Sequence, residues 1–381
     1  MEWKEYSLGD ISKLKYGKNV SAKLCKGPVP IFSGYRKIGT CNTINCKKNT
    51  VIVIARGAGG CGDVKLTKED CFLTNLSISV ELDKGICNAK WFYYNHLLNN
   101  LSFLNSGSAQ PQITIDSLSK YLIRIPPIII QRKIAGILSA LDSKIENNNK
   151  INANLEAQAQ ALFKSWFVDF TPFKDQPFVD SELGPIPQGW KVGKLEDLGE
   201  IVGGSTPSKS KPEYYTTHGI AWLTPKDLST SKAKFTSRGE IDITDEGYNS
   251  TSTKLMPRGS VLFSSRAPIG YLTIAKNEIC TNQGFKSLVP NGAGTGFIYY
   301  TLRHLTPQIE NRATGSTFKE ASATLMRSVE TIVPPTSILN KFEELLRPIL
   351  QFQEKKEEEN QRLAALRDTL LPKLMSGEIK L

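Results

Sequence analysis

The sequence predicts an α+β protein in which two duplicated globular domains are joined by two long helices that pair as an antiparallel coiled coil, with pseudo-twofold symmetry. Three observations support this prediction. The chain repeats itself with a period near 208 residues, each copy opens with short strand-like runs broken by glycine, proline and asparagine, and each copy closes with a long heptad-patterned stretch. A chain of 381 residues is long enough for two or three domains that each bury a core.

The repeat is visible as short motifs that recur in the same order. The matching segments, first copy and then second, are Leu8 to Ile11 with Leu198 to Ile201, Val51 to Arg56 with Val261 to Arg266, Thr74-Asn75 with Thr281-Asn282, Gly107-Ser108 with Gly315-Ser316, and Ile125 to Pro127 with Val333 to Pro335. Because the order is kept and the offset is nearly constant, these matches indicate duplication of a whole domain. The unit is too long for a short-period solenoid.

The predicted boundaries follow the two Pro-Pro pairs and the changes in composition. We expect a first globular domain at 1–129, a central helical spacer at 130–170, a linker at 171–189, a second globular domain at 190–337 and a C-terminal helical spacer at 338–381. Four prolines between 172 and 187 indicate that the linker is semi-rigid.

Both helical stretches carry a seam of residues in alternating steps of four and three, as in a coiled coil. The seam positions include Leu138, Leu141, Ile145, Asn152, Leu155 and Leu162 in the first copy, and Leu346, Ile349, Asn360, Leu363 and Leu370 in the second. Both seams are apolar at the ends and polar in the middle, which favours pairing of the two helices, since a buried Asn fixes register. The alternative is that each helix packs only on its own domain. Residues 132–167 would span about 54 Å, against about 34–36 Å for one turn of duplex DNA.

Charge and composition narrow the function classes. Lys and Arg outnumber Asp and Glu by 48 to 37, a net charge of +11, and residues 1–129 hold 17 basic and 9 acidic residues. A basic surface favours nucleic acid through counterion release, although anionic membranes or acidic proteins would also suit it. The sequence has neither a run of ~20 apolar residues nor a signal peptide, so we expect a cytoplasmic protein without a membrane partner. Seven cysteines without a Cys-x-x-Cys pair, and three scattered histidines, predict reduced thiols and no metal site.

Catalytic motifs are nearly absent. Residues 57–62 fit the pattern Gly-x-Gly-x-x-Gly after a strand, which would suit a dinucleotide or S-adenosylmethionine loop. However, the next residues do not begin an apolar-faced helix, and the second copy lacks these glycines. The sequence also lacks the signatures of an amino-methyltransferase, a phosphate loop and a serine hydrolase. We therefore expect no catalytic activity in this chain. The alternatives are an S-adenosylmethionine enzyme that uses the Gly57 loop and a coiled-coil scaffold without sequence-specific DNA binding.

A duplicated, basic, non-catalytic chain with a helical spacer suits a protein that reads duplex DNA at two places. Polar loop residues at matching places in the two copies are the candidate DNA contacts, because Arg can bind guanine and Gln can bind adenine. They are Ser33, Tyr35, Arg36, Arg56, Ser108, Gln110 and Gln112 in the first copy, and Thr224, Lys226, Arg266, Ser316, Thr317 and Lys319 in the second. Because these residues differ between the copies, we expect two different half-sites. Phosphate contacts are the commoner kind at such interfaces.

Three segments add a family resemblance. Residues 161–170 (ALFKSWFVDF), 181–190 (SELGPIPQGW) and 370–379 (LLPKLMSGEI) resemble the end of the central conserved helix, the entry to the second recognition domain and the end of the C-terminal helix in the specificity subunits of type I restriction-modification enzymes. The resemblance covers essentially the whole chain in the expected order. In the first copy, residues 109–112 depart from the loop pattern of residues 317–320.

This resemblance implies a non-catalytic subunit whose two target recognition domains bind an asymmetric, interrupted sequence in double-stranded DNA, with the helices setting the gap. The implied partners are two modification subunits, which bind S-adenosylmethionine and methylate adenine, and two restriction subunits, which use ATP and Mg²⁺. No cofactor is implied for this chain itself, and base flipping would belong to the modification subunits.

Overall fold

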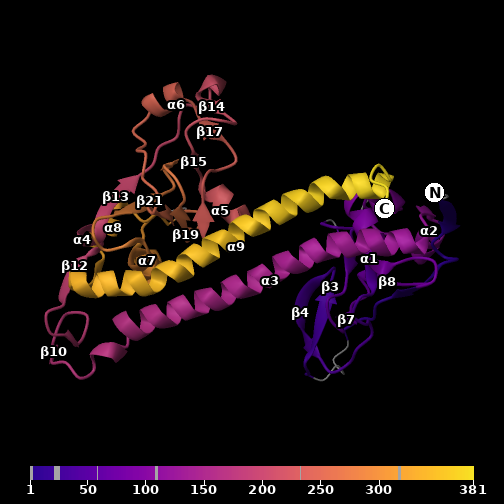
Figure 1. Ribbon diagram of the computed structural model, residues 1–381, viewed down its shortest axis with the longest axis horizontal. Coiled ribbons are helices and arrows are strands. Elements are labelled where there is room, and N and C mark those ends of the chain that lie inside the picture. Colours follow the sequence, from indigo (N-terminus) through magenta and orange to yellow (C-terminus); the bar gives the residue numbers. More distant parts are fainter. Residues whose placement is uncertain (1–2, 21–25, 58, 108–109, 232, 316–318) are drawn as a thin grey trace. The chain divides into compact units, whose positions relative to one another are not determined.

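The computed structural model describes residues 3–20, 26–57, 59–107, 110–231, 233–315 and 319–381. Its contacts divide into two compact units. Unit 1 comprises Met1–Glu146 with Asn360–Leu381, and unit 2 comprises Asn147–Glu359. Two long helices, α3 (Ile128–Phe167) and α9 (Thr336–Ser376), contribute to both units (Figure 1). The predicted separation into globular domains and independent spacers is therefore too simple, because each unit includes part of each long helix.

Unit 1 is built on a four-stranded sheet in the order β2-β8-β5-β6, a three-stranded sheet in the order β4-β3-β7 and the strand pair β1-β9. The strands are β1 (Lys4–Ser7), β2 (Ser12–Tyr16), β3 (Val29–Ser33), β4 (Arg36–Cys41), β5 (Val51–Ile54), β6 (Val64–Leu66), β7 (Phe72–Leu73), β8 (Ser77–Leu82) and β9 (Leu122–Ile125). Its helices, besides its part of α3 and α9, are α1 (Ala89–Leu98), η1 (Ser102–Leu104) and α2 (Ile115–Ser119). The central strand β5 is buried on both faces, which is why its sequence, VIVI, is continuously apolar rather than alternating.

Unit 2 contains a five-stranded sheet in the order β13-β21-β18-β19-β16 and the strand pairs β12-β22, β14-β17, β15-β20 and β10-β11. The strands are β10 (Phe178–Val179), β11 (Ile186–Pro187), β12 (Lys191–Lys194), β13 (Gly199–Gly203), β14 (Tyr215–Thr216), β15 (Trp222–Leu223), β16 (Phe235–Thr236), β17 (Asp242–Ile243), β18 (Val261–Ser265), β19 (Ile269–Ala275), β20 (Cys280–Thr281), β21 (Lys286–Pro290) and β22 (Glu330–Val333). The shorter helices are η2 (Thr171–Phe173), α4 (Leu195–Leu198), η3 (Pro212–Tyr214), α5 (Pro225–Ser231), α6 (Asp245–Asn249), α7 (Thr295–Arg312) and α8 (Ala323–Ser328).

The two units share a topology, which confirms the duplication. Each has an antiparallel strand pair that joins the start of the repeat to its end, β1-β9 and β12-β22, and each has a short parallel pair, β3-β7 and β15-β20. After the parallel pair, the amide of Thr74 donates to the carbonyl of Phe32 (3.0 Å), and the amide of Asn282 donates to the carbonyl of Leu223 (2.9 Å). Thr74 is therefore equivalent to Asn282, one position away from the match that the sequence suggested.

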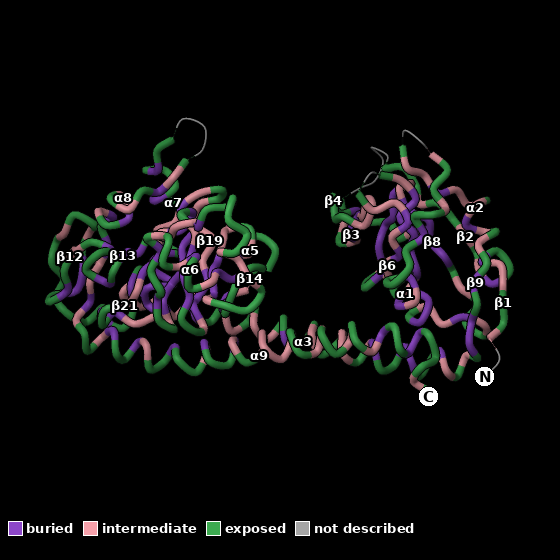
Figure 2. The backbone as a smooth tube through the Cα atoms, turned by 90° about the horizontal axis from the view of Figure 1, so that it is seen from above, coloured by how far each residue is buried: buried purple, intermediate pink, exposed green. Residues whose placement is uncertain are grey.

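The long helices pair with opposite directions in each unit, as the heptad pattern predicted. In unit 1, Asp142 of α3 contacts Arg367 of α9, with 2.8 Å between carboxylate and guanidinium. In unit 2, the ring centroids of Phe167 and Phe342 lie 4.7 Å apart. All eleven predicted seam residues are buried or half-buried. The helices also pack on the domain cores, so the alternative of packing on a single domain describes only part of each interface (Figure 2).

The segment 171–189, which its prolines marked as a semi-rigid linker, packs into unit 2. Phe173 and Ile186 are buried in the core of unit 2, and the rings of Phe173 and Trp190 lie 5.0 Å apart. Proline spacing reports a stiff backbone, but it carries no information on whether the neighbouring apolar side chains find a core. The segment therefore belongs to the packed structure of unit 2.

A buried polar cluster joins the globular part of unit 2 to both long helices. The ammonium of Lys234, which is 8% exposed, lies 2.6 Å from a carboxylate oxygen of Glu156 on α3 and donates to Gln353 Oε1 on α9 (3.0 Å). Tyr300 of α7 accepts from the same ammonium (2.7 Å) and donates to Glu156 (2.9 Å). Burial opposes ionisation of Glu156, but Lys234, Gln160 and Tyr300 outweigh it and lower the pKa of this carboxyl to about 2.

Unit 1 has a related contact at an equivalent tyrosine. The hydroxyl of Tyr94 donates to Asp142 of α3 (2.6 Å), and Asp142 is paired with Arg367 of α9. Burial, followed by the hydrogen bond to Asp142, raises the pKa of Tyr94. In both units, therefore, a tyrosine hydroxyl from the globular part binds a carboxylate of α3.

Glu156→Gln is expected to destabilise the protein by about 2 kcal/mol at pH 7, because it leaves the buried ammonium without its counter-charge. The folded pKa of Glu156 lies below its ordinary value of 4.5, so its contribution is present above pH 4.5 and is lost as the pH falls towards 2. Urea unfolding at pH 7 and pH 3 should show the difference between wild type and variant narrowing in acid. Glu278→Gln, at an exposed carboxylate, is the matched control and should leave stability unchanged at both pH values. A pH-independent effect of Glu156→Gln would contradict this account.

Candidate nucleic-acid interface

In unit 2, predicted contact residues lie at one edge, where β15, β18 and β20 end. Thr224 follows β15 and Arg266 follows β18. The chain between β20 and β21 links the two, because Asn282 donates to the carbonyl of Leu223 (2.9 Å) and Ser265 donates to that of Gly284 (2.8 Å). The structure thus brings Thr224 and Arg266 to the same edge although 41 residues separate them in sequence.

Thr224 and Lys226 are held by carboxylates at this edge. The amide and hydroxyl of Thr224 both donate to Asp227 Oδ2 at 2.7 Å, which fixes the start of α5. The exposed ammonium of Lys226 lies 3.1 Å from Glu240. An exposed pair of this kind contributes little to stability and separates readily, so Lys226 can exchange Glu240 for another anion.

Arg266 and Lys286 share one carboxylate. Glu320 lies 3.3 Å from the guanidinium of Arg266 and 3.5 Å from the ammonium of Lys286. The exposed Lys319 donates to the carbonyl of Glu310 (3.3 Å). Ser316 and Thr317 were also predicted contacts, but they lie outside the described residues. Arg266 is half-exposed, and its ion pair with Glu320 orients the guanidinium. A bound nucleic acid would either replace Glu320 as the partner of Arg266 or contact both side chains.

Unit 1 has the equivalent edge with different side chains. Arg56 follows β5, as Arg266 follows β18, and it forms a backbone bridge with Gln112, the counterpart of Glu320. The Nε atom of Arg56 is buried and meets no acceptor among the described residues. Gln112 is half-buried and Gln110 is exposed, whereas Ser108 lies outside the described residues. A neutral amide thus stands where unit 2 has a carboxylate.

Ser33, Tyr35 and Arg36 form the hairpin between β3 and β4 in unit 1. Gly34 and Tyr35 both have positive φ (51° and 62°), as a two-residue hairpin of type I′ requires. The hydroxyl of Tyr35 donates to the carbonyl of Leu66 (2.9 Å), while Ser33 accepts from the hydroxyl of Thr74 (3.2 Å). Tyr35 therefore supports the hairpin through its hydroxyl, and Arg36 is the exposed member of the group.

Sequence reasoning missed a recess of about 510 Å³ beside Thr224 in unit 2. Its lining combines hydroxyls, amides, charged groups and two aromatic rings: Thr206, Lys209, Tyr215, Trp222, Thr224, Lys226, Asp227, Glu240, Ile241, Asn282 and Gln283. The repeat could have pointed to Asn282, since its segment is one of the matches, but nothing in the sequence places Thr206 and Lys209 beside it.

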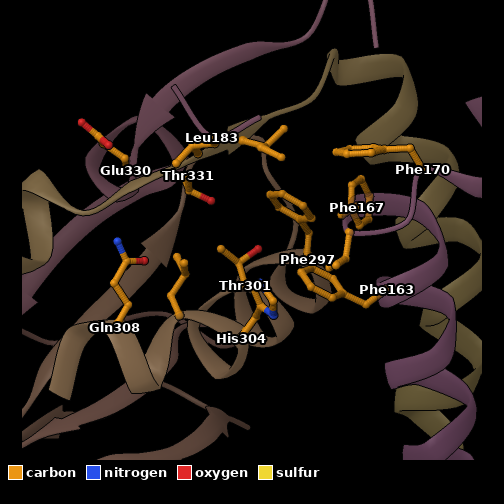
Figure 3. Close-up of a pocket in the computed structure, with 13 residues that line it drawn as sticks. Phe163, Phe167, Phe170, Leu183, Phe297, Thr301, His304, Gln308, Glu330 and Thr331 are labelled. Atoms are coloured by element: carbon orange, nitrogen blue, oxygen red, sulfur yellow. The ribbon is translucent and has the colours of Figure 1, made fainter. Parts of the chain in front are cut away.

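A second cavity of unit 2, of about 270 Å³, lies between the end of α3 and helix α7 (Figure 3). Phe163, Phe167, Phe170 and Phe297 give it a mainly apolar lining. The buried hydroxyl of Thr301 has no hydrogen-bond partner among the described residues. None of the predicted contact residues that the structure describes lines this cavity, so it is a weaker candidate for nucleic-acid contact.

The Gly57 loop does not have the structure of a nucleotide-binding turn. The next element after β5 is strand β6, whereas a dinucleotide loop leads from its strand into a helix. The alternative of an S-adenosylmethionine enzyme is therefore not supported. Among the described residues, no group of three or more His, Cys, Asp and Glu could hold a metal ion. No helix in the described part of the chain is both long and apolar enough to span a bilayer.

Comparison with known proteins identifies one family. Residues 1–157 and 187–363 match the family described as "Type I restriction modification DNA specificity domain". The specificity subunit of the type I restriction enzyme HindI from Haemophilus influenzae is 27% identical over 470 aligned positions, which cover 99% of this chain and 100% of that protein. The MjaIX specificity subunit from Methanocaldococcus jannaschii is 37% identical over 179 residues, covering 44% of this chain and 41% of that protein. The crystal structure of a type I restriction-modification S subunit from M. genitalium has the same fold, with a TM-score of 0.69 at 18% identity, covering 98% and 96% of the two chains.

Gly204→Ala is expected to disrupt the edge of unit 2, while Gly203→Ala leaves it intact. A Cβ atom at Gly204 would lie 2.2 Å from the carbonyl oxygens of both Thr281 and Asn282, whereas at Gly203 the nearest atom is 3.8 Å away. We expect a loss of roughly 1–3 kcal/mol and a lower Tm for the first variant only. Thermal melts of the two variants check this, and equal melting temperatures would show that the loop is not held as described.

Proposed function

This chain belongs to the type I restriction-modification DNA specificity family, and on that premise we propose that it is a non-catalytic subunit whose two units each read one half of an interrupted DNA target. The observation that carries the proposal is that both units have the same polar edge at the ends of equivalent strands. Each unit presents polar side chains at the ends of its central strand and of its parallel strand pair, at topologically equivalent positions. We retain 1–129 and 190–337 as the two target recognition domains.

The differences between the edges support an asymmetric target. Glu320 stands where unit 1 has Gln112, and Asn282 stands where unit 1 has Thr74. A carboxylate accepts from cytosine N4, whereas a glutamine can bind adenine through both an acceptor and a donor. Equivalent positions with different hydrogen-bonding groups are suited to read different base pairs.

The continuous helices α3 and α9 support a spacing role, because each contributes residues to both units. In this proposal, 130–170 and 338–381 set the gap between the half-sites and dock two modification subunits, with two restriction subunits completing the enzyme. S-adenosylmethionine and adenine methylation belong to the modification subunits, and ATP with Mg²⁺ belongs to the restriction subunits. The net positive charge of the chain suits a DNA ligand.

Co-expression of this chain with its modification subunit in a methylation-free host should create one interrupted, adenine-methylated motif. Single-molecule sequencing reads that motif directly, and it should vanish when this chain is omitted. A soluble complex that methylates no motif would contradict the proposed function and favour the scaffold alternative.

Arg266→Ala should relax one half of that motif and leave the other half unchanged, because Arg266 lies at the edge of unit 2 only. A bidentate Arg–guanine contact is worth about 1–3 kcal/mol of discrimination, so we expect roughly 5- to 150-fold less preference at one base pair. Arg258→Ala is the matched control, because the guanidinium of Arg258 binds Glu354 on α9, 2.8 Å away, outside that edge. A motif unchanged by Arg266→Ala would remove Arg266 from base reading.

A heptad inserted into α3 between residues 145 and 152, with a matching heptad between residues 353 and 360 of α9, should lengthen the gap of the motif by about three base pairs. Seven helical residues add about 10.5 Å, and base pairs are about 3.4 Å apart. An active complex with the original gap would refute the spacing role.

A further inference from the structure

We propose that the recess beside Thr224 is a hydrogen-bond-donating site for acceptor atoms of DNA, with Gln283 as its principal contact. This inference rests on the proposed function and extends it to residues outside the predicted set. Its lining carries two lysines, Lys209 and Lys226, and two acids, Asp227 and Glu240, so charge alone does not define its ligand. The ligand is identified instead by which hydrogen-bond donors of the recess are free and which acceptors already have a partner.

The walls of the recess are fixed by hydrogen bonds to the loop that follows Gly204. Trp222 Nε1 donates to the carbonyl of Ser205 (3.1 Å), and the hydroxyl of Tyr215 donates to the carbonyl of Pro207 (2.6 Å). The polar atoms of both rings are therefore used inside the protein. The rings offer apolar faces, and two of the loop carbonyls are no longer free to accept from a ligand.

The amide and Asp227 acceptors of the recess are also occupied, and Glu240 accepts from Lys226 through one of its two oxygens (3.1 Å). Gln283 Oε1 accepts from the hydroxyl of Thr206, and Asn282 Oδ1 accepts from the amide of Gly284 (2.9 Å). Asp227 uses one oxygen for Thr224 and the other for the amide of Glu240 (2.9 Å). The recess thus has few acceptors left for a ligand.

The donors, in contrast, remain available. No acceptor among the described residues is bonded to the Nε2 group of Gln283, the Nδ2 group of Asn282 or the ammonium of Lys209. Gln283 and Lys209 are exposed, and Asn282 is half-exposed. The hydroxyl of Thr206 occupies Oε1, so the NH₂ group is the part of the Gln283 amide that remains free for a ligand.

A site with free amide and ammonium donors favours groups that accept hydrogen bonds. On duplex DNA these include phosphate oxygens and, in the major groove, the O6 and N7 atoms of guanine. Duplex DNA, the proposed ligand, carries both kinds of group. Thr224 lines the recess and lies on the edge that also carries Arg266. Unit 1 has Thr74 at the position of Asn282, so its equivalent surface offers a different set of groups.

The test compares Gln283→Glu and Gln283→Ala with wild type in the complex with the modification subunit. Glu at this position keeps an acceptor for Thr206 but replaces the NH₂ donor by a carboxylate, so the fold is retained while the proposed contact is lost. Binding is measured on a duplex that carries the methylated motif and on a duplex without it, at two salt concentrations. We expect at least tenfold weaker binding of the motif duplex for both variants, with Gln283→Glu the weaker. Gln188→Ala, at an exposed glutamine of unit 2 outside the recess, is the matched control and should bind like wild type.

Two results support the site and identify the acceptor. Equal losses on both duplexes assign the contact to a phosphate, whereas a loss confined to the motif duplex, with one base pair relaxed, assigns it to a base edge. Wild-type affinity and an unchanged motif for Gln283→Glu would overturn the inference while leaving the proposed function intact. Absence of any motif with the wild-type complex would instead overturn the proposed function.

Discussion

The burial of Lys234 against Glu156 is the interaction on which the arrangement of unit 2 depends. An ammonium that is 8% exposed requires a counter-charge and further acceptors, and here they come from both long helices and from Tyr300 of α7. Any rotation of the globular part against α3 or α9 would leave that charge unpaired. The ion pair therefore selects one orientation of the recognition domain on its helices, and Glu357 adds to this by accepting the amides of Lys234 and Phe235 (3.1 and 3.2 Å).

Because these contacts fix the orientation of each domain, the side chains at the candidate DNA-binding edge of each unit can vary. The contacts that orient each domain lie on helix-facing surfaces: Lys234 and Tyr300 in unit 2, Tyr94 in unit 1. The proposed DNA contacts lie instead at strand ends and turns, where the backbone path is held by the sheets. A substitution such as Glu for Gln at the position of Gln112 and Glu320 changes the hydrogen-bonding groups without touching the orienting contacts. Two domains of one topology can thus carry different specificities.

Local patterns made the helices and the repeat predictable. The heptad seam depends on residues three and four apart, and it identified positions that are buried or half-buried in both helices. The strand ends were also identifiable, since Arg56 follows a continuous apolar run and Arg266 stands at the matching place in the repeat. Features set by distant residues were not predictable: the pairing of Arg266 with Glu320, the use of the Tyr35 hydroxyl by the backbone, and the burial of Phe173 in a segment that composition marked as a linker. Each depends on which remote group the fold brings into reach.

The two units differ in how charge and hydrogen bonding are distributed, and this has a consequence for DNA binding. Residues 1–129, which belong to unit 1, hold 17 basic and 9 acidic residues, whereas residues 171–337, which belong to unit 2, hold 18 and 16. Affinity from counterion release depends on the phosphates that the protein neutralises, so the larger electrostatic share is expected from unit 1. At the edge of unit 2, Glu320 and Glu240 already engage the nearby cations, and an approaching duplex must compete for them. A duplex without matching acceptors gains little from that exchange, so unit 2 is suited to discriminate between sequences rather than to hold any DNA.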